Sequence, residues 1–229
     1  MIFVRPVKSE DFSEITELCL RVYPGVKPWN EVQLSSHLKV FPEGQLVAVD
    51  DESNKIVGYA ASLIISWDDY EPSSSWRDVT EMGMFTNHDP EHGKTLYGAE
   101  VMVDPKLQGK GVGKLLYTAR AELAERLGML RIRAGARLRH YGRYTKELSP
   151  ADYVKKVIRG ELYDPTLTFQ LRRGFRVLWI ASSYLLNDPD SLGNAAVIEW
   201  INHKVADPRH YSLGDPKFQI TYTGTKNSR

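Results

Sequence analysis

Residues 100–116 combine residue types that bind phosphate with a strand and a helix that would hold them in place. They read Glu-Val-Met-Val-Asp-Pro-Lys-Leu-Gln-Gly-Lys-Gly-Val-Gly-Lys-Leu-Leu, an apolar strand, a glycine-rich turn and the start of an amphipathic helix. The N–H groups of a first helical turn have no partner within the helix, and the helix dipole adds about half a positive charge there. We therefore expect an anion-binding site in the loop from Gln108 to Lys114.

The glycines and lysines of this loop have different expected tasks. Gly109, Gly111 and Gly113 permit φ values that other residues avoid and let phosphate oxygens approach the main chain. Lys110 and Lys114 add mobile positive charge. The predicted cofactor-binding set, which includes the strand before the loop, is Val101, Met102, Val103, Gln108, Gly109, Lys110, Gly111, Val112, Gly113 and Lys114.

Two other glycine-loop motifs do not fit these residues. A Walker A loop ending at Lys114 would need glycine at position 108 and Ser or Thr at 115, where Gln and Leu stand. A dinucleotide fingerprint starting at Gly109 meets Lys114 where glycine or alanine is needed, and one starting at Gly111 meets Leu116. The pattern that remains is Gln-x-x-Gly-x-Gly over residues 108–113.

The rest of the chain predicts the elements that would position this loop. Apolar periodicity, caps and turn residues define them. We expect strands over 2–7, 45–50, 55–67, 96–103, 130–136, 176–182 and 195–201, helices beginning at Ser9 and after Asn30, and helices over 112–127 and 165–173.

The loop resembles motif A of the GCN5-related N-acetyltransferases (GNATs), whose strand four, loop and helix three bind the pantetheine and pyrophosphate of acetyl-CoA. The order of elements over roughly residues 1–203 and the Gly174-Phe175 pair support the resemblance. Residues 97–105, 163–170 and 198–202 are most similar to acetyltransferase modules found fused to nitrilase-like carbon-nitrogen hydrolases. The resemblance implies an α/β fold with a mixed sheet of about seven strands and flanking helices, acetyl-CoA as cosubstrate, and no metal.

One segment departs from the family pattern. Residues 137–164 lengthen the link between strand five and helix four, and Ser149-Pro150 followed by Asp152 predicts an inserted helix there. The insertion is either extra surface covering or a substrate lid. We thus expect one acetyltransferase domain over 1–203, with a long loop at 68–94 and this insertion at 137–164, followed by a polar tail at 204–229.

The catalytic positions implied by the resemblance are altered in this chain. Gln170 stands where many family members carry a tyrosine acid, and Arg131 stands where many carry a strand-five glutamate. Glu100 is the best remaining candidate base, and its alternative is a structural carboxylate bonded to Arg131 or Arg133. The thioester carbonyl would be polarised by a main-chain N–H near Met102 or Val103.

Tyrosines and arginines of the insertion supply the remaining candidates. Tyr141, Tyr144 or Tyr163 would replace the missing acid, and Tyr141 and Tyr163 are taken as catalytic. Residues 126–159 hold ten Lys or Arg residues against two acids, which favours an acidic ligand. The predicted acceptor is a small-molecule or peptide amine that carries an acidic group, and its predicted substrate-binding residues are Arg137, Arg139, Arg143 and Tyr144.

Composition limits the other functions. The net charge of +1 argues against a general nucleic-acid binder, although RNA binding by the basic insertion is a rival hypothesis. An acyl-CoA-binding regulatory module without turnover is another, motivated by Gln170 and Arg131. The early charge at Arg5, the single Cys19 and the absence of a long apolar run indicate a cytoplasmic protein without a membrane segment. The sequence is also compatible with a homodimer.

One further pattern is weighed against a metal. His88-Asp-Pro-Glu91-His92 formally matches the His-x-x-Glu-His zinc motif. Pro90 opposes the helix that would align the two imidazoles, so we expect a turn here and no metal site.

Overall fold

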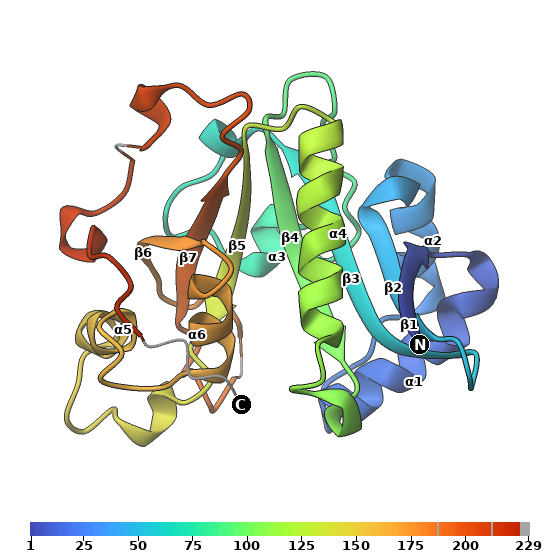
Figure 1. Cartoon of the computed structure of the whole chain (residues 1–229), viewed down its shortest axis with the longest axis horizontal. Coiled ribbons are helices and arrows are strands. Elements are labelled where there is room, and N and C mark those ends of the chain that lie inside the picture. Colours follow the sequence, from blue (N-terminus) through green and yellow to red (C-terminus); the bar gives the residue numbers. More distant parts are fainter. Residues whose placement is uncertain (187, 212, 225–229) are drawn as a thin grey trace. The chain divides into compact units, whose positions relative to one another are not determined.

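The computed structural model describes residues 1–186, 188–211 and 213–224. Seven strands form one sheet, as expected, and their order is β1-β2-β3-β4-β5-β7-β6 (Figure 1). The chain divides into two compact units, Met1–Trp67 with Thr80–Ile132, and Asp68–Val79 with Arg133–Arg229. The division falls inside β5 (Arg131–Arg137) and inside the long loop of residues 68–94.

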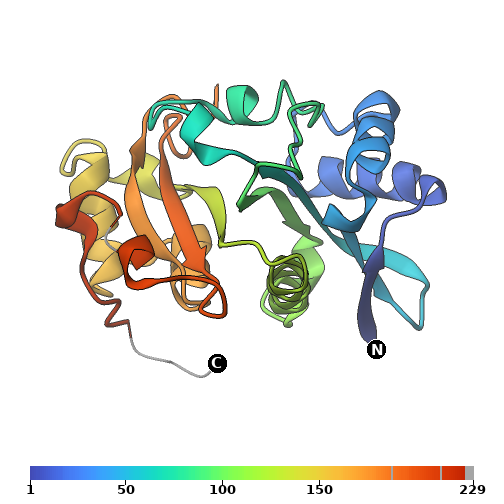
Figure 2. The same cartoon turned by 90° about the horizontal axis from the view of Figure 1, so that it is seen from above.

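Unit 1 contains four antiparallel strands and three helices. Each strand pairs with the next along the chain. Figure 2 shows α4 end-on at one face of these strands, and α1 and α2 at the other face. The elements are β1 (Ile2–Pro6), α1 (Phe12–Val22), α2 (Glu31–Val40), β2 (Gln45–Asp50), β3 (Lys55–Ile65), β4 (Thr95–Val103) and α4 (Val112–Arg126).

A small apolar core fixes α4 on the sheet. Val112 and Leu116 of the helix are buried in one cluster with residues of β2 and β3, namely Leu46, Ala48, Val57 and Ala60. Burial of such side chains is worth about 1.5–3 kcal/mol each. Because Val112 is the first residue of α4, this packing places the N-terminus of the helix just beyond the end of β4.

Several predicted boundaries are confirmed by their caps. Asn30 accepts a hydrogen bond from the Gln33 N–H at 3.0 Å and begins α2. Gly128 has φ +65° just after α4. β3 ends at Ile65, earlier than the sequence predicts, because Trp67 already belongs to a 3-10 turn (Trp67–Asp69).

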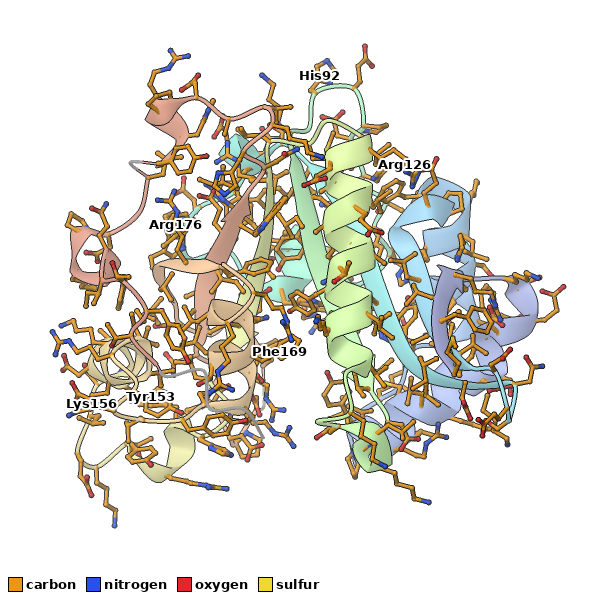
Figure 3. The ribbon with its side chains drawn as sticks, viewed as in Figure 1. His92, Arg126, Tyr153, Lys156, Phe169 and Arg176 are labelled. Carbon is orange, nitrogen blue, oxygen red and sulfur yellow. The ribbon has the colours of Figure 1, made fainter. Side chains whose placement is uncertain are left out.

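Unit 2 contains the inserted helix, as expected. The unit comprises α3 (Trp76–Val79), most of β5, α5 (Pro150–Ile158), α6 (Pro165–Leu171), β6 (Arg176–Ala181) and β7 (Ala195–Ile201). Ser149 accepts from the Asp152 N–H at 3.1 Å and begins α5, on which Tyr153 and Lys156 lie (Figure 3). β6 and β7 are antiparallel.

A buried ionic group joins the three strands of unit 2. Glu199 of β7 is 1% exposed and lies 2.7 Å from Arg133 of β5 and 2.7 Å from Arg176 of β6. Removing one member of such a group costs about 3–5 kcal/mol because a charge is left buried without compensation. Arg133, one of the two strand-five arginines offered as a partner for Glu100, therefore pairs with Glu199.

The described part of the predicted polar tail contacts the rest of unit 2 at several residues. The Asp215 N–H donates to the Leu178 carbonyl of β6 at 2.7 Å, and Phe218 is 2% exposed. The Thr223 N–H donates to the Ile158 carbonyl at the end of α5. In the described part of the chain, no helix is long and apolar enough to cross a membrane.

Candidate active site

The glycine loop has the open geometry that an anion site requires. Gly109 and Gly111 have φ of +77° and +92°, and a Cβ at either would meet no atom within 4 Å. Gly111 is the N-cap of α4 and no side chain caps the helix there. The first N–H groups of α4 are thus left to an external acceptor, and Lys110 and Lys114 are exposed beside them.

The expectation for Gly113 is wrong in one respect. This residue lies within α4 and is not among the glycines with positive φ. Its lack of a side chain can serve close approach only, because helical φ is open to any residue. Gln108 reaches back from the loop, with its Nε2 3.4 Å from the Val103 carbonyl.

A β-bulge interrupts β4 shortly before the loop. In the register with β3, Ala61 faces Glu100 while the neighbouring Ser62 faces Gly98, so the pairing skips Ala99. A bulge bends the strand and redirects the side chains next to it. Here it aims the side chain of Glu100 at the α1 face.

Glu100 lies in a set of hydrogen-bond donors. The Tyr23 hydroxyl at the end of α1 donates to its Oε1 at 2.9 Å, and the Val101 N–H donates to the same atom at 3.0 Å. The Trp29 side chain donates as well. Burial raises the pKa of Glu100, while these donors and the nearby Arg120 charge oppose the rise. The Glu100 carboxylate is thus a stronger proton acceptor than an exposed glutamate.

The backbone register narrows the expected carbonyl-polarising N–H group to one residue. The Asp104 N–H donates to the Val57 carbonyl on β3 at 2.9 Å. N–H groups alternate between the two edges of a strand, so that of Met102 also faces β3. The Val103 N–H therefore points to the opposite edge of β4, and Val103 rather than Met102 is the candidate.

Sequence reasoning missed three unit 1 residues of this site, Tyr23, Trp29 and Arg120. Tyr23 stands at the end of α1, where Pro24-Gly25 marked only a helix end. Arg120 occupies the buried stripe of α4 and is 2% exposed. Its position four residues after Leu116 was the available signal, because an arginine in an apolar helical stripe needs a polar partner inside the protein.

The predicted tyrosines lie in unit 2 and are packed to different degrees. The Tyr141 hydroxyl donates to the Leu148 carbonyl at 3.1 Å, and burial raises its pKa. Tyr144 packs against Tyr153, with ring centroids 5.4 Å apart. Tyr163 is 58% exposed. The hydroxyl of Tyr141 is therefore engaged within its own loop, whereas the Tyr163 residue is largely exposed.

The three predicted acceptor arginines also differ. Arg137 forms a bidentate pair with Asp188, with Nε 2.6 Å from Oδ2, and lies 2.9 Å from Asp190. These two carboxylates compete with an acceptor for the Arg137 guanidinium, and its role in acceptor binding stays a prediction. Arg139 and Arg143 are exposed.

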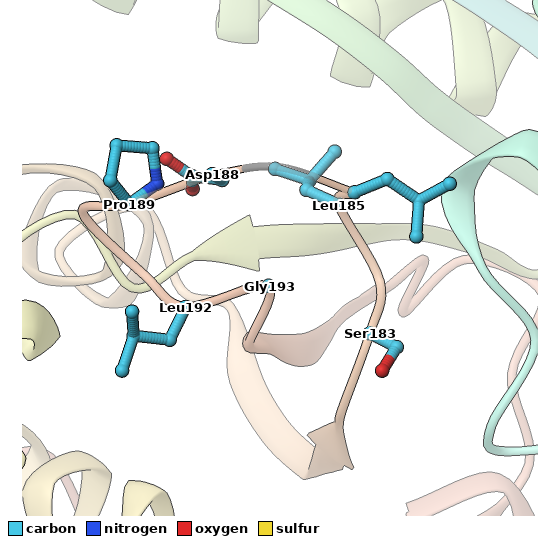
Figure 4. A pocket seen from close by; sticks show the side chains of 7 residues that line it. Ser183, Leu185, Asp188, Pro189, Leu192 and Gly193 are labelled. Atoms are coloured by element: carbon cyan, nitrogen blue, oxygen red, sulfur yellow. The ribbon is translucent and has the colours of Figure 1, made fainter.

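An open pocket adjoins the Arg137 pair within unit 2 (Figure 4). It lies in the connection between β6 and β7, which sequence reasoning did not single out. Leucine side chains dominate it, and Asp188 contributes a carboxylate. Its lining consists of Ser183, Leu185, Leu186, Asp188, Pro189, Leu192 and Gly193.

The residues of the zinc-like pattern form a turn, as expected. The His88 Nδ1 accepts from the Ile64 N–H at 3.0 Å, and its ring stacks on Phe41 at 4.5 Å. His92 lies 3.2 Å from Asp89 in the same turn. Over the residues that the structure describes, no group of three or more His, Cys, Asp or Glu side chains could hold a metal ion.

Comparison with known proteins places these features in a family. The model of the "Acetyltransferase (GNAT) family" matches residues 10–141. The chain is 40% identical over 199 residues to the probable hydrolase YhcX of Bacillus subtilis, covering 87% of the chain but 38% of that protein. It is 34% identical to the uncharacterized N-acetyltransferase YkwB of the same organism, covering 87% of the chain and 88% of YkwB.

Solved structures share the fold at low identity. The loading GNATL domain of CurA from Lyngbya majuscula has a TM-score of 0.75 at 20% identity, over 88% of this chain and 98% of that one. The GNAT-like decarboxylase GphF in complex with isobutyryl-CoA has a TM-score of 0.72 at 23% identity, over 86% of this chain and 98% of that one.

Proposed function

The chain belongs to the GNAT acetyltransferase family, and on that premise we propose that it transfers an acetyl group from acetyl-CoA to an amine by direct attack within a ternary complex. The observation that carries the proposal is the uncapped, glycine-flanked N-terminus of α4, which follows the strand that bears Glu100. Two consecutive elements, β4 and α4, thus supply a carboxylate and an anion site. YkwB, which has 34% identity to this chain, is named an N-acetyltransferase.

The loop fits the pyrophosphate of CoA as a substrate. Gly109 and Gly111 leave open space where a side chain would stand, and the N–H groups of the first turn of α4 can donate to phosphate oxygens. Lys110 and Lys114 supply countercharge. Val101, Met102 and Val103 would line the path from this loop toward the thioester.

We assign the proton transfers to Glu100 and Tyr23. The amine nitrogen attacks the thioester carbonyl, a C–N bond forms, the C–S bond breaks, and Glu100 accepts a proton from the nitrogen. The departing thiolate takes a proton from the Tyr23 hydroxyl, which recovers one from Glu100 across their 2.9 Å hydrogen bond. The Val103 N–H stabilises the negative charge on the carbonyl oxygen. The net result moves one proton from nitrogen to sulfur.

Tyr141 and Tyr163 remain alternative acids, and single substitutions can separate the three. Tyr23→Phe should slow the chemical step on the order of a hundredfold, the range of general acid catalysis. Tyr163→Phe is the matched comparison, since it removes a hydroxyl from an exposed tyrosine of unit 2. A loss confined to Tyr163→Phe or Tyr141→Phe would transfer the acid role to that residue.

The test of the proposed function measures free thiol released from acetyl-CoA with a panel of amines. Initial rates at several concentrations of both substrates should give intersecting lines, as a ternary complex requires, whereas parallel lines would indicate an acetyl-enzyme. CoA binding without thiol release for any amine would favour the regulatory module.

A second arm of the assay supplies an acyl-CoA that carries a free carboxylate and measures release of carbon dioxide. GphF is described as a decarboxylase, and the likeness to it shows the fold and not the reaction. Carbon dioxide release without thiol release would replace acetyl transfer by decarboxylation.

Salt-sensitive RNA binding that survives Gly111→Asp would support the hypothesis that the basic insertion binds RNA.

A further inference from the structure

Arg120 of α4 ends at the bulge of β4. The side chain is 2% exposed. Its Nε donates to the Ser62 Oγ at 3.0 Å, and its Nη2 donates to the carbonyls of Ala61 at 3.0 Å and Glu100 at 2.7 Å. These partners stand on both strands at the step where the register between β3 and β4 shifts.

Burying a guanidinium between a helix and a sheet has a large desolvation cost. Tyr117 is also buried and its ring centroid lies 5.6 Å from the Arg120 guanidinium, whereas the other nearby buried residues of α4, Leu116, Leu123 and Ala124, pack without a desolvation cost. Burial lowers the pKa of Arg120, which reports that cost. The planar fork of an arginine can serve several acceptors at fixed angles, as a lysine cannot. Arg120 therefore supplies hydrogen bonds to the bulge that an apolar side chain could not supply.

We propose that Arg120 is a positioning residue for acetyl transfer, which fixes the bulge so that Glu100 faces the acceptor amine and which favours the carboxylate form of Glu100 by its positive charge. The inference rests on the proposed function. Its two parts, geometry and charge, can be separated by substitution.

The surroundings of Glu100 make Arg120 the positive partner among the groups recorded there. Tyr23 donates to the carboxylate from α1, and Cys19 of the same helix, Tyr59 of β3 and Arg120 of α4 interact with it through space. The thiol and the phenols are neutral at pH 7 when they are protonated. Arg120 carries a full positive charge and favours the Glu100 carboxylate through space, in addition to the hydrogen bonds from Tyr23 and Val101.

Two variants test the proposal. Arg120→Gln removes the charge but keeps an amide donor for the carbonyls, and it should move the acidic limb of the kcat/KM pH profile upward by about one pH unit. Arg120→Lys keeps the charge but loses the fork. It should leave that limb in place and lower kcat on the order of tenfold, with the KM for acetyl-CoA unchanged.

Controls separate positioning from loss of folding. Arg126→Lys changes an exposed arginine at the other end of α4 (Figure 3), which pairs with Glu43 at 3.0 Å, and should alter neither quantity. If Arg120→Gln fails to fold, Ser62→Ala removes only the bond to Nε and should lower kcat at unchanged KM. An unchanged kcat in Ser62→Ala and in Arg120→Lys would overturn the geometric part.

Carbon-13 NMR titration of glutamate carboxyl groups decides the charge part without an activity assay. Glu100→Gln identifies the Glu100 signal, whose midpoint should rise by about one pH unit in Arg120→Gln. An unmoved midpoint would overturn it, whatever the enzyme does. If Glu100→Gln stays fully active, the proposed base is wrong, and the NMR midpoint still reports whether Arg120 controls Glu100.

Discussion

Glu100 is the residue on which the proposed chemistry depends, so its isosteric replacement is the first prediction. Glu100→Gln should lower kcat on the order of a hundredfold at neutral pH, because the amide cannot accept the proton. Acetyl-CoA affinity should change little, since the carboxyl group faces Tyr23 and not the glycine loop. Steady-state rates and a CoA titration check this.

The pH profile of the parent enzyme gives an independent check of the same residue. Glu100 must be ionised to act as a base, so kcat/KM should fall as the pH decreases through its pKa. Because burial raises that pKa, the limb should lie above the ordinary glutamate value of about 4.3. Glu100→Gln should lack the limb. Equal losses of folding stability and activity in this variant would assign Glu100 a structural role.

The second prediction concerns Gly111. Gly111→Asp adds a side chain and a negative charge at a residue with φ +92°, so it should abolish the rise in melting temperature that CoA causes in the parent. Gly128→Asp is the matched control. Gly128 also has positive φ and open space, but it follows the other end of α4. An undiminished CoA shift in Gly111→Asp would place the cofactor elsewhere.

At this scale the sequence predicted the loop better than the catalytic residues. Glycines and lysines that act through the local backbone are visible as a pattern, and Gly109 and Gly111 adopt the expected φ. Residues that only tertiary contacts bring together leave no such pattern in the sequence. Tyr23 and Glu100 are distant in the sequence, and nothing local pairs them.

Among the elements, α2 contains a buried titratable group that should govern acid stability. His37 is 1% exposed, its Nε2–H donates to the Gly83 carbonyl at 2.8 Å, and burial lowers its pKa to about 4. Between pH 6.5 and 4 the unfolded chain binds a proton that the folded chain does not. As the pH falls from 6.5 to 4, the free energy of unfolding should therefore decrease, and His37 should account for on the order of 3 kcal/mol of this decrease.

Urea unfolding at several pH values measures this contribution. His37→Gln keeps an amide donor for Gly83 and cannot titrate, so its stability should decrease less steeply between pH 6.5 and 4. His88 also has a pKa lowered by burial, so some slope will persist. The exposed His92→Gln is the control. Identical slopes in the parent and His37→Gln would contradict the prediction.

Elements whose ends are marked by caps were predicted most accurately. Asn30, Gly128 and Ser149 act within a few residues, and the helices that they bound begin or end where expected. The bulge in β4 was not predicted, because a one-residue slip depends on what faces the strand and not on its own sequence. Arg120 of α4 makes hydrogen bonds to both strands at this bulge, and we propose that it fixes the bulge.

For the whole molecule, a test of acceptor recognition must leave the insertion folded. The insertion packs through Tyr153, whose hydroxyl donates to the buried Asp164 at 2.8 Å, and Asp164 caps α6. Replacing the insertion by a flexible link would expose that core and the contacts of the chain near Thr223. Single arginine substitutions are therefore a cleaner test than a deletion.

The last prediction separates the two kinds of arginine in the insertion. Arg139→Ala with Arg143→Ala should raise the acceptor KM on the order of tenfold, because each exposed guanidinium can hold a carboxylate or phosphate of the acceptor. The KM for acetyl-CoA and the melting temperature should not change. Arg137→Ala should instead lower the melting temperature and leave the acceptor KM unchanged, since it leaves the partly buried Asp188 without its cation.

Steady-state kinetics with acceptors that carry or lack an acidic group complete this test. The parent should prefer the acidic acceptor, and the double variant should lose that preference while neutral amines react as before. This outcome follows from charge alone, because alanine removes the guanidinium and leaves the backbone of the segment unchanged. If the double variant instead weakens acetyl-CoA binding at constant acceptor KM, these arginines serve the phosphates of CoA, and the acceptor is recognised elsewhere.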